Sequence, residues 1–144
     1  MHAHQPYRIA FVEPAASHTE HLRQLLQFEG MVVDTFGPDD LHRLVESRAD
    51  VLLLNHSRLR DATLTLALAA GRGLLPRPLT MALVSQGDEL RGVELVERGL
   101  DAYLVCPCGP REFVARVRAL LRRTRQARPG TAPEQPAHVP ATIR

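Results

Sequence analysis

The sequence predicts an α/β domain built on a doubly wound sheet of five parallel strands. Two observations support this prediction: five short apolar runs alternate with five amphipathic stretches, and the runs are almost continuously apolar. Strands that are buried on both faces of a parallel sheet have this composition, because helices cover each face. In such a sheet, functional residues gather at the carboxyl ends of the strands.

The expected strands follow the apolar runs. They lie at residues 8–12, 31–36, 50–54, 79–84 and 102–105. Helices are expected between them and after the last of them, with the three C-terminal ones at about 61–71, 88–98 and 110–125.

Capping and turn residues set the limits of the first two helices. A Ser-x-x-Glu pattern at residues 17–20 has the form of a capping box, which satisfies the free amides at a helix start. Gly30 ends this helix, and the turn residues 37–39 open the next one. The side chains expected on the inner faces of these two helices are Leu22, Leu25, Leu26, Leu41, Leu44 and Val45.

Residues 7–127 are expected to form one domain, because a chain of 144 residues with 44% hydrophobic content can bury one core. Residues 1–6 are expected to be a flexible N-terminus. Residues 128–144 contain four of the 11 prolines and no apolar periodicity, which is typical of a disordered tail or linker. The sequence shows neither a signal peptide nor an apolar run of membrane-spanning length, so we expect a cytoplasmic protein with no membrane contact.

The last strand and helix carry the most specific pattern. The segment GLDAYLVCPCGPREFVARVRALLRR at residues 99–123 resembles the end of two-component receiver domains of the OmpR/PhoB type, where Gly-Ala-Asp-Asp-Tyr-Leu-x-Lys-Pro-Phe is usual. RIAFVEP and ADVLLLN resemble the acidic first strand and the strand that ends in the phosphoacceptor. The resemblance implies a flavodoxin-like receiver topology and a role in signal transduction and transcriptional regulation. It also implies regulatory proteins as partners, and DNA contact only through a domain that is not in this chain.

Receiver chemistry requires two adjacent acids, an acceptor Asp, a Ser or Thr, and a Lys. Matched one at a time, these positions become Glu13 and Pro14, Asn55, Val84 and Cys106, with Ser85 next to the position of Val84. An amide cannot form an acyl phosphate, and one carboxylate beside one amide is a poor cage for magnesium. We therefore expect a degenerate phosphorylation pocket without metal or cofactor, in a protein that is not an enzyme and acts by protein contact.

Cys106 and Cys108 flank Pro107, and the chain has no other cysteine. The first interpretation is that both are small packing residues, since free cysteine is among the most buried side chains. The alternative is a metal, redox or small-molecule sensor that uses the degenerate phosphorylation pocket, with His18 and His56 joining the two cysteines as ligands. A disulfide between the two cysteines would close a strained ring.

A flavin or cobalamin carrier is a second rival, because it shares the predicted topology. Flavodoxins bind phosphate with a Ser/Thr/Gly loop after the first strand, and residues 13–20 contain no glycine.

The last helix is basic on one side and apolar on the other. Residues 111–128 contain seven Arg and one Glu, and the whole chain contains no Lys. In proteins of the OmpR/PhoB type this helix builds a dimer through salt bridges. The resemblance therefore implies a homodimer whose face contains Asp101, Glu112, Arg116 and Arg123, with Ala102 in place of the second Asp.

Overall fold

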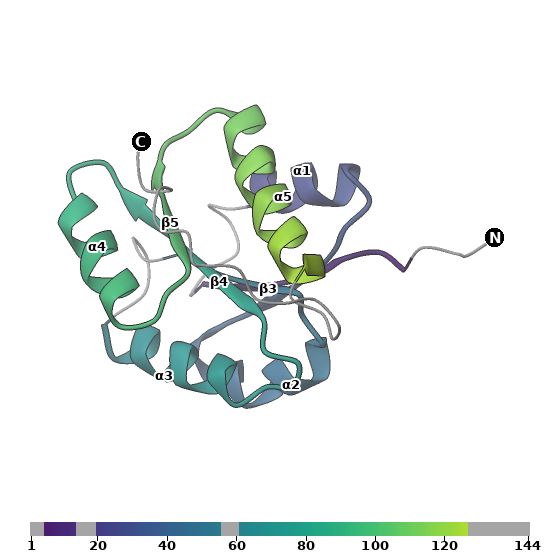
Figure 1. Cartoon of the computed structure of the whole chain (residues 1–144), viewed down its shortest axis with the longest axis horizontal. Coiled ribbons are helices and arrows are strands. Elements are labelled where there is room, and N and C mark those ends of the chain that lie inside the picture. Colours follow the sequence, from purple (N-terminus) through teal and green to yellow (C-terminus); the bar gives the residue numbers. More distant parts are fainter. Residues whose placement is uncertain (1–4, 14–19, 56–60, 127–144) are drawn as a thin grey trace.

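The computed structural model describes residues 5–13, 20–55 and 61–126. These residues form one parallel sheet with the strand order β2-β1-β3-β4-β5, and helices cover both of its faces (Figure 1). The predicted doubly wound fold is confirmed. The strands are β1 (Arg8–Val12), β2 (Val32–Phe36), β3 (Val51–Asn55), β4 (Leu79–Ser85) and β5 (Ala102–Cys106). The helices are α1 (Glu20–Phe28), η2 (Pro38–Arg43, a 3-10 helix), α2 (Leu44–Ser47), α3 (Asp61–Arg72), α4 (Glu89–Glu97) and α5 (Pro110–Gln126).

The sheet separates two apolar layers. On β1, β3 and β4, odd-numbered side chains such as Phe11 and Leu53 pack with α1 and α5. Even-numbered side chains such as Val12 and Leu54 pack with α2, α3 and α4. Successive side chains of a strand point to opposite faces, so each of these strands is buried on both sides. This double burial explains the continuous apolar runs of the sequence.

The segment after β2 differs from the prediction of one amphipathic helix. Residues 38–43 form a 3-10 helix, and only one short α-helical segment, α2, follows it. A 3-10 helix has three residues per turn. The residues that a period of 3.6 predicts to face the core are therefore not all the residues that face it here. Leu44 is buried as predicted, but Val45 is 62% exposed, and its predicted place on the inner face is wrong.

Several predictions concern residues that the structure leaves undescribed. Three predicted features lie outside the described ranges. They are residues 17–19 of the expected capping box, most of the N-terminal segment 1–6 and the Pro-rich segment 128–144. Within those ranges, no helix has both the length and the apolar character needed to cross a membrane.

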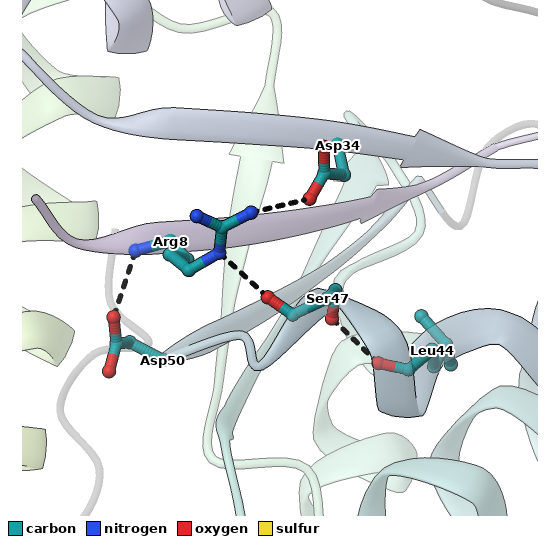
Figure 2. A network of polar contacts seen from close by, with 5 residues as sticks. All are labelled: Arg8, Asp34, Leu44, Ser47 and Asp50. Carbon is teal, nitrogen blue, oxygen red and sulfur yellow. Dashed lines mark hydrogen bonds and ion pairs between the residues drawn. The ribbon is translucent and has the colours of Figure 1, made fainter.

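Arg8 ties three elements together at the edge of the sheet where β1 begins (Figure 2). Its Nε donates to the carbonyl oxygen of Ser47 at 2.8 Å, and its guanidinium lies 3.4 Å from Asp34 Oδ2. The backbone N–H of Arg8 donates to Asp50 Oδ2 at 2.8 Å. Ser47 Oγ donates to the carbonyl oxygen of Leu44 at 2.7 Å. This network fastens the end of α2 to β1 and β2, at the edge of the sheet opposite the carboxyl ends of the strands.

Candidate functional site

The carboxyl ends of β1, β3, β4 and β5 bring four polar side chains to one edge of the sheet. Glu13 directly follows β1, and Asn55 ends β3. In the register of β1 and β3, Glu13 and Asn55 are the pair that comes directly after the last paired residues of these two strands. Ser85 ends β4 and is the register partner of Cys106, which ends β5. The edge thus combines a carboxylate, an amide, a hydroxyl and a thiol.

All four residues belong to the face of the sheet that α1 and α5 cover. The core under these helices contains the residue two positions before each of them, namely Phe11, Leu53, Leu83 and Leu104. Side chains two residues apart on a strand share a face, so the four polar residues share it too.

Val84 does not lie on this face. It is fully buried in the opposite layer, with α2, α3 and α4. The sequence match that put Val84 at the Ser/Thr position is therefore corrected, because β4 continues to Ser85 and a step of one residue reverses the face. The hydroxyl at the site edge belongs to Ser85.

Glu13 and Asn55 lie inside the protein, where they are only 3% and 5% exposed. The backbone N–H of Glu13 donates to the carbonyl oxygen of Phe36 at 3.0 Å, so the β1–β2 ladder continues to Glu13. Both residues have interaction partners within the protein. Such partners are needed at this depth, because burying a polar group without compensation costs free energy.

Cys106 and Cys108 are half-buried free thiols whose Sγ atoms lie 4.0 Å apart. Both side chains pack against the core under α1 and α5. Burial, reinforced by the neighbouring Cys108, raises the pKa of Cys106 to about 12. Burial also raises the pKa of Cys108. Both thiols are therefore protonated at neutral pH, which favours a packing role over oxidation sensing, since the thiolate is the reactive species.

Two known proteins match most of the chain, although no family model matches it. The transcriptional regulatory protein CpxR of Escherichia coli is 34% identical over 118 residues, covering 81% of this chain and 50% of CpxR. The phosphate regulon transcriptional regulatory protein PhoB of Rhizobium meliloti is 34% identical over 125 residues, covering 82% of this chain and 53% of PhoB. The chain therefore spans about half the length of these relatives.

A solved structure adds the fold. The receiver domain of AraT, a response regulator from Geobacillus stearothermophilus, superimposes with a TM-score of 0.69 at 20% identity, covering 85% of this chain and 98% of that domain. The chain contains a response-regulator receiver domain. In this receiver domain, the buried amide of Asn55 ends β3, at the position where the sequence resemblance puts the phosphoacceptor.

The receiver domain uses three of the four predicted dimer-face residues in contacts within the chain. Asp101 Oδ2 accepts hydrogen bonds from the backbone N–H and the hydroxyl of Thr80, at 2.8 and 3.0 Å. Thr80 Oγ1 accepts one from the Asp101 N–H, also at 3.0 Å. Glu112 and Arg116 form an ion pair along α5 at 3.6 Å. Arg123 is exposed. Sequence reasoning missed Thr80, although a threonine within an apolar run is a signal for such a bond.

The predicted metal ligands are only partly within the described residues. His18 and His56 lie outside them, as does Pro14 of the degenerate pocket. In the part of the receiver domain that the structure describes, no three or more His, Cys, Asp or Glu residues come together as a metal site. The set of two histidines and two cysteines therefore stays a prediction.

Proposed function

We propose that this receiver domain signals through protein contact and accepts no phosphoryl group. The observation that supports the proposal best is the buried amide of Asn55 at the end of β3. An amide does not form an acyl phosphate, and Glu13 next to it supplies only one of the carboxylates that hold magnesium. At the end of β5, the neutral thiol of Cys106 offers no positive charge to a phosphoryl group, because burial keeps its pKa near 12.

The proposed context is transcriptional regulation in two-component signalling. CpxR and PhoB are transcriptional regulatory proteins about twice as long as the matched segment. In this proposal the receiver domain is a regulatory module without enzyme activity, located in the cytoplasm. Other regulatory proteins are its partners, and a separate domain makes any contact with DNA.

Phosphorylation tests the proposal directly. Neither the wild type nor Asn55→Asp is expected to gain a stable phosphoryl group when incubated with magnesium and acetyl phosphate. Phosphoryl transfer requires the acceptor, the metal ligands and a cation on the phosphoryl group together, so one restored carboxylate is not sufficient. The measurement is intact mass under mild, non-acidic conditions, with a phosphorylatable receiver domain as positive control. Phosphorylation of the wild type would overturn the proposal. Phosphorylation of Asn55→Asp alone would show that the neutral thiol of Cys106 does not prevent phosphoryl transfer.

We also propose that the domain forms a homodimer through α5 without phosphorylation. Arg123 is exposed on this helix, so its guanidinium is accessible to a second chain. Arg123→Glu is expected to shift dimer towards monomer in analytical ultracentrifugation, and added salt is expected to weaken the wild-type dimer because exposed ion pairs are screened. Arg111→Glu is the matched control, since it makes the same charge change at another exposed position of α5. A wild type that stays monomeric at high concentration would contradict the proposed dimer.

A further inference from the structure

A groove of about 400 Å³ lies between α1 and α5, two helices that cover the same face of the sheet (Figure 1). Its lining combines three arginines with one glutamate and with apolar side chains. The residues that matter here are Leu25, Glu29, Arg111, Val114, Arg118 and Arg122. Because three cations face one carboxylate, the groove has an excess of positive charge, which attracts an anionic partner.

Glu29 shows how a carboxylate binds in this groove. Its Oε1 accepts a hydrogen bond from the guanidinium of Arg118, which joins the end of α1 to α5. Arg111 and Arg122 are exposed, and neither has an ion pair with a carboxylate within the described ranges. The groove therefore binds one carboxylate of its own chain and leaves two guanidinium groups for carboxylates of another molecule.

The three arginines are spaced along one side of α5. Arg118 lies four residues before Arg122 and seven residues after Arg111, so the three share a helix face. With a rise of 1.5 Å per residue, their Cα atoms span about 17 Å, or about three helical turns. A second helix offers carboxylates over the same length when acidic residues stand at positions i, i+4 and i+11. The apolar side chains of Leu25 and Val114 lie in the same groove and suit apolar residues between those acids.

We propose that the groove between α1 and α5 binds an acidic, amphipathic helical segment of a partner protein. Arginine is well suited to this role, because its planar guanidinium binds a carboxylate with two hydrogen bonds. A second copy of the groove across a two-fold axis is a poor occupant, because it would bring the same arginines together. The inference rests on the proposed function, since it names a surface for the protein contact through which the domain signals.

The test uses a fluorescein-labelled helical peptide with Glu at positions i, i+4 and i+11 and with leucines between them. The control peptide has Gln at the three Glu positions. Fluorescence anisotropy with the full chain measures both affinities. We expect the Glu peptide to bind at least about 10-fold more tightly than the Gln peptide, and added salt to reduce this difference. Equal affinities for the two peptides, or no binding of the Glu peptide, would overturn the proposal.

Variants of the groove locate the binding site. Arg111→Glu and Arg122→Glu are each expected to weaken binding of the Glu peptide by at least about 10-fold, because repulsion replaces attraction. Glu29→Gln is expected to strengthen binding, because Arg118 loses the carboxylate of its own chain that competes with the peptide. Arg77→Glu makes the same charge change at an exposed residue outside the groove and is expected to leave the affinity unchanged. An equal loss in Arg77→Glu and in the groove variants would show a general charge effect and overturn the proposal.

Sedimentation of the same variants separates this proposal from the proposed dimer. Arg111→Glu is expected to weaken peptide binding and to keep the dimer, because Arg111 lines the groove and Arg123 does not. A monomeric wild type that still binds the Glu peptide would contradict the dimer and leave the groove proposal in place. Dissociation of a wild-type dimer by the Glu peptide would show that a second copy occupies the groove, which would overturn the assignment to a partner protein.

Discussion

Asp101→Ala is expected to lower the free energy of unfolding by about 2–3 kcal/mol, the cost of leaving buried donors without their charged acceptor. The Asp101 carboxylate accepts hydrogen bonds from the backbone N–H and the hydroxyl of Thr80. Thr80 is only 5% exposed, so its donors lie inside the protein and depend on this acceptor. Urea denaturation measures the change, which should appear in the midpoint with the slope unaltered.

Two substitutions control for charge and for the acceptor. Asp101→Asn keeps an oxygen that can accept from Thr80 and is expected to cost less than alanine. Glu112→Ala removes an exposed carboxylate from α5 and should change stability by no more than about 0.5 kcal/mol. If Asp101→Ala abolished dimerisation with no loss of stability, the residue would be an interface residue and not a link between β4 and β5.

Gly92→Ala is expected to destabilise the domain although alanine is the better helix former. A Cβ atom at Gly92 would lie 2.5, 2.6 and 2.8 Å from three carbons of the Tyr103 ring. The ring is only 6% exposed and packs between α4 and the sheet, so it has little room to move. Overpacking costs about 1–3 kcal/mol, which outweighs the gain of up to about 1 kcal/mol in helix propensity. We expect a lower melting temperature.

A second glycine and a double mutant provide the controls. A Cβ atom at Gly109 would meet no atom within 4 Å, so Gly109→Ala has no steric cost and is expected to destabilise the domain less than Gly92→Ala. In a Tyr103→Leu background the cost of Gly92→Ala should shrink, because the ring that the methyl group meets is gone. A higher melting temperature for Gly92→Ala in the wild-type background would show that the helix yields to the added methyl group.

The strands were largely predictable from the sequence, because burial on both faces leaves a continuous apolar run. The limits of β1 agree with the prediction, and those of β3 differ by one residue at each end. The segment at 38–47 was less predictable, because its apolar residues fit a helical period while the chain adopts 3-10 turns. Local sequence does not show how a short connection must bend to reach β3.

The site residues were predictable where they directly follow an apolar run, as Glu13, Asn55 and Cys106 do. The choice between Val84 and Ser85 required the register of β4, because one residue decides which face a side chain takes. The role of Asp101 was not predictable, because its partner Thr80 lies 21 residues earlier in the chain. Contacts of this kind depend on which strands become neighbours, and the sequence around each residue does not record that.

The position of β1 has a consequence for the synthesis of the chain. β1 is synthesised before β2 and β3, yet in the sheet it lies between them. Its contacts with the start of β3 join residues as far apart as Arg8 and Asp50, which are 42 residues apart. Until β3 has emerged, one side of β1 presents unpaired N–H and C=O groups, which are a template for pairing with another chain. Nascent chains that stop before β3 therefore leave this side of β1 open to pairing with another chain.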